Sequence, residues 1–424
     1  MVWTTKLPKS TPLPMGADAH LILVGAGMVG ASLALALAPT GMRIKVLERA
    51  PQAPEVDLTL WGSRVSALNA HAYDVLAQLG IWDALPRVTP YQKMHVWDAE
   101  GTGELEFNAA DLQLKSLGYI VENHLVVAAL HAQLQNYSNV ELQYGCEPVA
   151  MTEPDTQGLR TLELQTPSGK QTLSVPLIVA ADGAHSPLRQ WAGMTTREWD
   201  YGHTALVTRV GLQYPHQKTA WQAFLAQGPL AFLPLTDLDG HQQQASIVWS
   251  TQSQHAQTLL ALPPQDFAGE LQKAFGNHLG QIQVLEPVQS FPLRQRHATT
   301  YVKPGFALVG DAAHTIHPLA GQGVNLGFKD VHALAKILIE AYEQEIPLGD
   351  IRILRKYSRT RQPDNLSMMA SMEALKRLFS ARPLPICWLR NWGMRRLNQQ
   401  AWIKNALITH ALGESLPLEH PWRA

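Results

Sequence analysis

Three glycines near the start of the chain have the spacing of a dinucleotide-binding turn. Gly25, Gly27 and Gly30 stand in the pattern G-x-G-x-x-G, after an apolar run at 21–24 and before a helical run rich in Ala and Leu. In this context the first glycine makes a tight turn, the second lets the backbone approach a pyrophosphate, and the third lets helix pack on strand. The N–H groups at the start of the helix would then bind the phosphates.

An acidic residue follows at the distance that such a site requires. Glu48 ends a second strand-like run, 43–47, and lies eighteen residues after Gly30. A carboxylate at about this distance accepts hydrogen bonds from ribose hydroxyls. The eighteen residues 21–38 carry no charge, so hydropathy alone also permits a membrane span or a signal peptide. Neither explains the glycines or Glu48, so we predict a βαβ nucleotide unit, which leaves FAD and NAD(P) undecided.

A second acidic motif lies in the run from Gly310 to Gly327. The apolar segment 306–309 leads into Gly310 and Asp311, and glycines recur before and after Asn325. An acid at a strand end can accept hydrogen bonds from ribityl hydroxyls, and a helix start can direct its N–H groups at the pyrimidine edge of a flavin. Reduction places negative charge there, which the helix dipole stabilises by about 0.3–2 kcal/mol. This run therefore favours FAD.

A third motif follows the buried strand predicted at 177–181. Asp182 can bond groups on the phosphate side, Gly183 permits close backbone approach, and Arg189 can brace the loop or meet a phosphate. A simple strand-to-helix turn with an Asp cap explains these residues equally well.

Composition excludes several classes of protein. The chain has 424 residues, 34 Lys and Arg against 35 Asp and Glu, and only two cysteines, Cys146 and Cys387. A near-zero net charge gives no electrostatic footprint for nucleic acid, so we expect no nucleic-acid partner. Two cysteines exclude a disulfide framework and a Cys-based zinc site, and they fit a reducing, cytoplasmic location. We expect no metal site.

The order of motifs predicts an α/β fold. Between about 200 and 300, paired strands without intervening helices indicate an antiparallel sheet inserted into the nucleotide domain. We therefore expect a Rossmann-like FAD-binding domain with an inserted, mainly antiparallel β-sheet substrate domain and a C-terminal helical segment. The expected boundaries are an N-terminal extension at 1–19, the FAD-binding domain at 20–85, 118–195 and 300–375, the substrate domain at 86–117 and 196–299, and the helical segment at 376–424.

The three motifs, in this order and spacing, resemble the single-component FAD-dependent aromatic hydroxylases of the 4-hydroxybenzoate hydroxylase superfamily. The resemblance covers nearly all of residues 20–412. Some segments resemble the hydroxylases of 2-polyprenyl-3-methyl-6-methoxy-1,4-benzoquinol and others those of 2-polyprenylphenol, so the ring position stays open. The segments most similar to the bacterial hydroxylases of ubiquinone biosynthesis are 64–69, 117–123, 199–201, 231–235 and 310–327.

This resemblance implies an enzyme with FAD as its cofactor. NADH or NADPH and O2 would be co-substrates, and a flavin C4a-hydroperoxide would hydroxylate a polyprenylated phenol or quinol. The implied FAD-binding residues are Gly25, Gly27, Gly30, Glu48, Arg64, Asn123, Asp182, Gly183, Gly310, Asp311, Gly321, Gly323, Val324 and Asn325. Beside the flavin ring it places Pro318 and the segment from Gly321 to Asn325, and our candidate catalytic residues are Pro318, Gln322 and His317.

Several roles stay open at this point. For His314 and His317 we weigh a proton relay against a loop histidine that merely bonds backbone, and the latter is favoured. On the inserted sheet we name Tyr201, His203, Phe232 and Pro234 as candidates for a substrate wall, and ordinary sheet packing explains each of them equally well. A hydroxylase of a soluble phenol and a non-catalytic flavoprotein scaffold are the alternative functions.

The C-terminal segment indicates a partner. From Ala374 to Gly413 there are seven basic residues and no acidic one, interleaved with Trp and Leu. Basic, aromatic amphipathic helices can lie at an anionic membrane surface, where a polyprenylated substrate would reside. For 376–424 we therefore weigh a peripheral contact with the inner face of the cytoplasmic membrane against packing on the FAD domain or on other ubiquinone-biosynthesis proteins.

Overall fold

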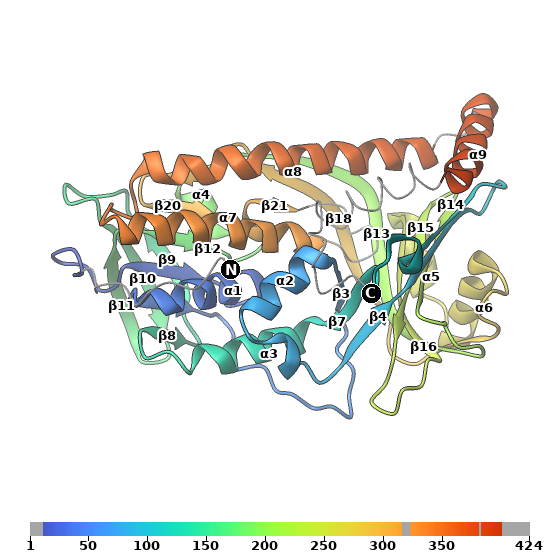
Figure 1. Ribbon diagram of the computed structural model, residues 1–424, viewed down its shortest axis with the longest axis horizontal. Coiled ribbons are helices and arrows are strands. Elements are labelled where there is room, and N and C mark those ends of the chain that lie inside the picture. The colour runs from blue at the N-terminus through green and yellow to red at the C-terminus, as the bar shows by residue number, and fades with distance from the viewer. Residues whose placement is uncertain (1–11, 316–322, 381–382, 401–424) are drawn as a thin grey trace.

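The structure is a computed structural model of the chain, and it describes residues 12–315, 323–380 and 383–400 (Figure 1). Its centre is a mostly parallel sheet with the strand order β19-β20-β12-β1-β2-β8, in which only β19 runs antiparallel to its neighbour. The strands of this sheet are β1 (Leu21–Val24), β2 (Ile44–Leu47), β8 (Val140–Gln143), β12 (Ile178–Ala180), β19 (Val302–Lys303) and β20 (Phe306–Leu308).

Apolar strands in this sheet need helices over them because both of their faces are buried. All four residues of β1 are buried, as are all three of β12. Helix α1 contacts both α3 and α7, and α7 in turn contacts α8. The helices and 3-10 helices of this half are α1 (Met28–Leu37), η1 (Ala38–Thr40), α2 (Ala70–Gln78), η2 (Trp82–Ala84), α3 (Asn123–Leu134), α4 (Pro187–Trp191), η4 (Gly310–Ala312), α7 (Gly323–Glu343) and α8 (Ile351–Ser380).

The uncharged run 21–38 is therefore divided between a strand and a helix. Residues 21–24 form β1, and α1 begins at Met28, after the glycine turn. Within the described parts of the chain, no helix is both long and apolar enough to cross a membrane.

Two small antiparallel sheets flank the parallel sheet. One has the order β11-β10-β9, and the other has the order β3-β7-β4. Their strands are β3 (Val65–Leu68), β4 (Val88–Tyr91), β7 (Gly118–Glu122), β9 (Glu147–Met151), β10 (Arg160–Thr166) and β11 (Gly169–Val175). The β3-β7-β4 sheet brings the segment after Arg64 beside the start of α3 because Val65 pairs with Glu122.

A large sheet forms the other half of the molecule (Figure 1). Its order is β21-β18-β13-β16-β15-β14-β5-β6, and β17 pairs with β13. Its pairs are antiparallel except for β14 and β5, which run parallel. The elements of this half are β5 (Lys93–Asp98), β6 (Glu104–Asn108), η3 (Ala109–Leu112), β13 (Thr196–Leu212), β14 (Thr219–Leu225), β15 (Gly228–Leu235), β16 (Gln244–Gln252), α5 (Ser253–Leu260), α6 (Pro264–Phe275), β17 (Ile282–Val284), β18 (Gln289–Ala298) and β21 (His314–Thr315).

One face of the large sheet packs against α5 and α6. Successive residues of a strand point to opposite faces, so alternate residues of each strand share this core. Leu206 and Val210 of β13 belong to it together with Phe267 and Phe275 of α6. The opposite face is thereby left for the FAD-binding half. The predicted α/β class with an inserted, mainly antiparallel sheet is confirmed.

The C-terminal helices connect the two halves. The long helix α8 runs along the molecule, and α9 (Leu384–Gln399) lies at its far end (Figure 1). Helix α9 contacts β6, and the buried Arg390 forms an ion pair with the buried Asp98 at the end of β5. Asn391 accepts the backbone N–H of Thr102 at 2.8 Å. This ion pair and this hydrogen bond fix α9 to the outer edge of the large sheet.

Candidate active site

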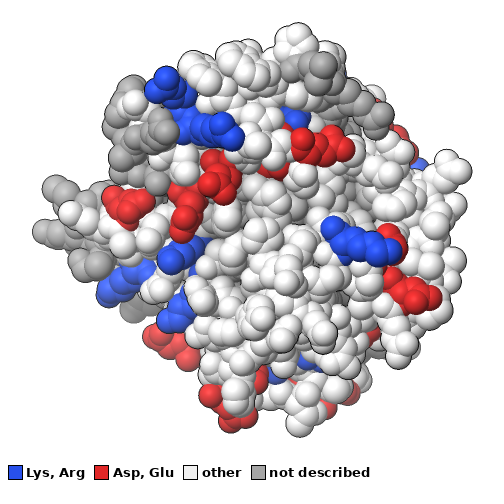
Figure 2. All heavy atoms as spheres, turned by 90° about the vertical axis from the view of Figure 1, so that its right-hand side faces the viewer, with Lys and Arg blue, Asp and Glu red and all other residues white. Residues whose placement is uncertain are grey.

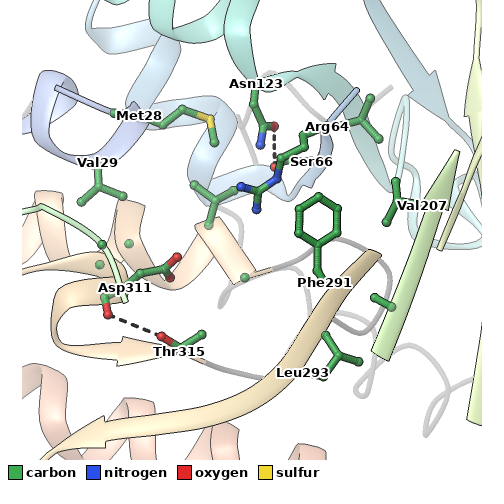
Figure 3. Close-up of a pocket in the computed structure, with 18 of the residues that line it drawn as sticks. Met28, Val29, Arg64, Ser66, Asn123, Val207, Phe291, Leu293, Asp311 and Thr315 are labelled. Carbon is green, nitrogen blue, oxygen red and sulfur yellow. Dashed lines mark hydrogen bonds between the residues drawn. The ribbon is translucent and has the colours of Figure 1, made fainter. Parts of the chain in front are cut away.

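The ends of three parallel strands meet at one edge of the central sheet. The loops after β1, β12 and β20 lie there because the carboxyl ends of parallel strands share an edge, and ligands of such sheets bind at that edge. A cavity of about 410 Å³ opens between these loops and the large sheet (Figure 3). Its lining includes Gly27, Arg64, Asn123, Gly183, Val207, Val248, Phe291, Leu293, Gly310, Asp311, Gly323 and Val324.

The glycine turn has a separate steric reason at each glycine. A Cβ on Gly25, whose φ is +99°, would lie 2.4 Å from the carbonyl oxygen of Ala181. On Gly30 a Cβ would lie 1.9 Å from the carbonyl oxygen of Gly25, so helix and strand could not pack as they do. A Cβ on Gly27 would meet nothing within 4 Å, and Gly27 lines the cavity. The open space at Gly27 fits the close approach of a pyrophosphate.

Glu48 is fixed beside this turn. One of its carboxylate oxygens accepts the backbone N–H of Ala26 at 2.8 Å, and the other accepts that of Ala50 at 2.9 Å. Glu48 does not line the cavity itself. Its place at the end of β2, next to the glycine turn, is where a dinucleotide site has its ribose-binding acid.

Charged and polar side chains from separate segments of the nucleotide domain enter the cavity. Arg64 and Asp311 point into it (Figure 3), and the Arg64 guanidinium carbon lies 5.4 Å from the centre of the Phe291 ring. Burial raises the pKa of Asp311, although His314 and Arg64 act in the opposite direction. Asn123 accepts the Ser66 hydroxyl at 2.8 Å, which holds its amide at the cavity wall.

Two predicted cofactor residues lie just behind the lining. Asn325 is buried; its side chain accepts the backbone N–H of Asn69 at 3.2 Å and donates to the carbonyl of Ala67 at 2.9 Å. It therefore ties α7 to the segment between β3 and α2. Asp182 precedes the lining residue Gly183, and burial raises the pKa of its carboxyl group.

Of the remaining residues predicted near the flavin ring, those before residue 316 are described by the structure and those from 316 to 322 are not. His317, Pro318, Gly321 and Gln322 lie outside the described residues. His314 is buried, and its Nε2 lies 2.6 Å from a carboxylate oxygen of Asp330. The sequence favoured a bond to the backbone for this loop histidine, and the structure shows a hydrogen bond to a side-chain carboxylate instead.

The large sheet supplies an apolar wall that the sequence analysis did not identify. Ala205 and Val207 of β13 line the cavity with Val248 of β16 and with Phe291 and Leu293 of β18. The alternation of side chains along β13 indicates this wall: Leu206 and Val210 lie on the core face of the strand, so the residues between them point to the opposite face. That signal could not tell which face would meet the cofactor.

None of the four predicted wall residues lines this cavity. Phe232 pairs with the core residue Ile247, and its ring centre lies 3.9 Å from that of Phe275. Its neighbour Ala231 instead pairs with the lining residue Val248. Pro234 lies two residues beyond Phe232 and is buried.

Tyr201 and His203 lie further along β13. The Tyr201 hydroxyl donates a hydrogen bond to Gln295 of β18, and burial raises its pKa. The pairing of β13 with β18 shifts its register between Asp200 and His203. Contact between substrate and Tyr201, His203, Phe232 or Pro234 stays a prediction.

Comparison with known proteins agrees with this geometry. A family described as FAD binding domain matches residues 18–370. The 3-demethoxyubiquinol 3-hydroxylase of Escherichia coli strain K12 is 37% identical over 93% of this chain and 98% of its own length. The ubiquinone hydroxylase UbiL of Rhodospirillum rubrum is 35% identical over 96% of this chain and 93% of its own. This chain belongs to the family of FAD-dependent hydroxylases of ubiquinone biosynthesis.

A solved structure of low sequence identity shares the fold of this chain. The crystal structure of p-nitrophenol 4-monooxygenase PnpA from Pseudomonas putida DLL-E4 superposes with a TM-score of 0.76 at 19% identity, covering 94% of this chain and 98% of that one. The ubiquinone biosynthesis monooxygenase COQ6 of Danio rerio, described as mitochondrial, is 34% identical over 92% of this chain and 89% of its own. The predicted family, enzyme class and FAD cofactor are confirmed.

The described residues fit FAD. Gly27 leaves room for a pyrophosphate, Glu48 lies beside it for the ribose, and Asp311 points into the cavity where a ribityl chain would leave the dinucleotide edge. The N-terminal residues of α7, Gly323 and Val324, line the same cavity. Their position lets the positive end of the helix dipole face a reduced flavin.

Substitution of two glycines separates protein packing from cofactor contact. Gly30→Ala should lower the melting temperature of the FAD-free protein, because its Cβ would overlap the Gly25 carbonyl. Gly27→Ala should leave that temperature within about 1 °C, which for a chain of this length corresponds to about 1 kcal/mol, and weaken FAD binding at least about tenfold. Thermal unfolding and titration of flavin fluorescence measure the two effects. Unchanged FAD affinity in Gly27→Ala would contradict the pyrophosphate assignment.

A pair of phenylalanines tests the two faces of the large sheet. Phe232→Ala should reduce the free energy of unfolding by about 3–5 kcal/mol, because Phe232 is fully buried in the core under α6. Phe291→Ala, on the cavity face, should cost less stability and should instead weaken substrate binding. Urea unfolding and the KM for substrate report the two effects. A Phe232→Ala protein with normal stability and a raised KM would restore Phe232 to the substrate wall.

Proposed function

We propose that this protein hydroxylates the aromatic ring of a polyprenylated phenol or benzoquinol, using NAD(P)H and O2. The observation that carries the proposal is the single cavity that joins a dinucleotide-binding glycine turn to an apolar sheet wall. The names of the relatives support the choice of substrate class, because they include a 3-demethoxyubiquinol 3-hydroxylase and a ubiquinone hydroxylase.

The chain's own residues have three tasks in this reaction. Bound FAD, reduced by NAD(P)H, supplies the activation of O2 and the transfer of one oxygen atom to the ring. The glycine turn and Glu48 bind the ADP part of the cofactor, and Asp311 binds its ribityl chain. The described residues around the cavity include no nucleophile paired with a base, and a flavin hydroxylation does not require one.

The apolar wall has a chemical purpose in this mechanism. Val207, Val248 and Leu293 exclude water from the side of the cavity that faces the large sheet. Exclusion of water keeps activated oxygen from being released as H2O2 before it reaches the substrate. The same residues form an apolar surface against which a quinol ring can lie.

Two of the described lining residues are basic, Arg64 and Arg294, and Arg294 is paired with Asp200, so we assign the role of the cavity's cation to Arg64. Its guanidinium group lies against Phe291, which holds it at the boundary between the FAD side and the apolar wall. A cation in this place favours a phenolate over a neutral phenol, and a phenolate ring is the more reactive acceptor of oxygen. We assign to Arg64 this electrostatic role in addition to contact with FAD.

Substrate-dependent oxidation of NAD(P)H tests the proposal against its alternatives. A short-chain prenylated phenol or quinol should stimulate oxidation by the holoenzyme and yield hydroxylated product, and Asp311→Ala should lose FAD or hydroxylation. Stimulation by small polar phenols alone would support a hydroxylase of a soluble phenol. No stimulation by either class would support a non-catalytic scaffold. Mass spectrometry of quinones in a deletion strain then identifies the ring position from the intermediate that accumulates.

We further propose that α9 brings the enzyme to an anionic membrane surface. Trp388, Leu389 and Trp392 form an exposed apolar patch on α9, with exposed fractions of 68%, 57% and 48%. The rings of Trp388 and Trp392 are stacked, and the Arg396 guanidinium lies 5.7 Å from the Trp392 ring. Arg395 and Arg396 are both exposed one turn further on. Aromatic and basic residues in this arrangement suit the boundary between lipid headgroups and acyl chains.

The surroundings of α9 are compatible with this role. Figure 2 faces the end of the molecule that carries α9 and the outer strands, and most of the visible surface there is neither acidic nor basic. Arg390 and Asn391 bind the β5–β6 turn, so the Trp388, Leu389 and Trp392 patch is left on the opposite side of the helix. Attachment at this end would hold the enzyme beside a substrate dissolved in the bilayer.

Vesicle flotation tests the membrane proposal. The intact protein should float with vesicles that contain anionic lipid, and a Trp388→Ser, Trp392→Ser double variant should lose at least about half of that binding, because each exposed indole contributes buried apolar area. Trp191→Ser is the control, because Trp191 is an exposed tryptophan on α4. Equal flotation of the double variant and the control would refute a role for α9, and absence of all flotation would favour a protein partner.

A further inference from the structure

Asp330 is a fully buried carboxylate behind the cavity. It lies on α7, and one oxygen accepts the backbone N–H of Gly310 at 3.0 Å and lies 2.6 Å from Nε2 of His314. The other oxygen accepts a hydrogen bond from the Arg361 side chain of α8 at 2.8 Å. Three separate segments of the chain therefore meet at one side chain.

The two loop partners of Asp330 lie on either side of Asp311. Gly310 precedes Asp311 and His314 follows it by three residues, so Asp330 holds both ends of the short segment that points the Asp311 carboxylate into the cavity (Figure 3). His314 also begins β21, which pairs with β18 at His297. The position of Asp311 thus depends on a group that does not line the cavity.

Asp330 is suited to this task because it stays ionised. Burial alone would raise its pKa, but the charges and hydrogen bonds of His314 and Arg361 outweigh burial and lower the pKa. A hydrogen bond to an ionised acceptor is about twice as strong as one between neutral groups. Asp330 is therefore a stiff support for the loop.

Arg361 is itself held in place. Its guanidinium donates to Asn365 at 2.7 Å and also binds Asp364. Asn365 in turn donates to the Tyr301 hydroxyl at 3.0 Å, and that hydroxyl lies 3.0 Å from Nε2 of His297. The network thus extends from α8 through Asp330 to the cavity loop and, by a second route, to β18.

We propose that Asp330 is a positioning residue of the flavin site, which sets the affinity and the reactivity of FAD by holding the segment from Gly310 to His314. The inference rests on the proposed function only in that the cavity binds FAD. Nothing in it depends on the identity of the substrate. Asp330 acts through Asp311 and the backbone, and it contacts no part of the cofactor directly.

Asp330→Asn is the direct test. The amide keeps the shape of the side chain but loses its charge, and its NH2 group would face either the Gly310 and His314 donors or Arg361. We expect the FAD dissociation constant to rise about tenfold, the flavin midpoint potential to shift, and less product to form per NAD(P)H at saturating FAD. Flavin fluorescence, spectroelectrochemistry and the ratio of product to H2O2 measure these effects.

Asp98→Asn is the matched control. Asp98 is also a buried carboxylate paired with a buried arginine, Arg390, but it lies at the end of β5 and does not line the cavity. Both variants should lower the melting temperature, whereas only Asp330→Asn should change the three flavin measurements. Equal flavin behaviour in the two variants would reduce Asp330 to a structural residue and overturn the proposal.

A second variant covers the case in which Asp330→Asn does not fold. His314→Gln leaves the pair of Asp330 and Arg361 intact and removes one loop contact, so it should change FAD affinity and coupling in the same direction. Unchanged flavin behaviour in this variant would contradict the proposal. If the wild-type holoenzyme binds FAD but hydroxylates no phenol, the proposed function fails while the affinity and potential measurements still decide the role of Asp330.

Discussion

The close packing of β1, α1 and the loop after β12 is the constraint on which the rest of this structure depends. Backbone atoms approach so closely at Gly25 and Gly30 that no side-chain carbon fits. This contact brings the ends of the parallel strands together and leaves Gly27 open. Neighbouring parts of the FAD side are tied to this turn: Glu48 bonds its backbone, and Val29 of α1 packs against Gly310 and Gly327.

The FAD half of the site could be predicted from the sequence because its determinants are local. Glycine spacing, a strand before it and an acid after it act over about 25 residues, and the structure has each in the expected place. Asn325 shows the limit of this reasoning. Its position in a glycine-rich run indicated cofactor contact, whereas its amide is occupied by Ala67 and Asn69 from a distant part of the chain.

The substrate half could not be predicted in the same way because it depends on the pairing of distant strands. Phe232 and Ala231 are adjacent, and the sequence does not say which of them faces α6. The choice follows from the position of α5 and α6, which is a tertiary property. Asp330 likewise carries no motif of its own, and its importance appears only when α8 and the loop after β20 come together around it.

The parallel pairing of β14 with β5 couples the folding of the large sheet to that of the nucleotide domain. Residues 93–98 precede most of the nucleotide domain in the chain, yet they hydrogen-bond to residues 219–224, well over a hundred positions later. Contacts of such long sequence separation slow folding, because a large loop must close first. We therefore expect the outer edge of the large sheet to be completed late, and residues 196–299 cut out alone would lack three strands of this sheet, β5, β6 and β21. Domain exchange between relatives must move the early segment together with the inserted sheet.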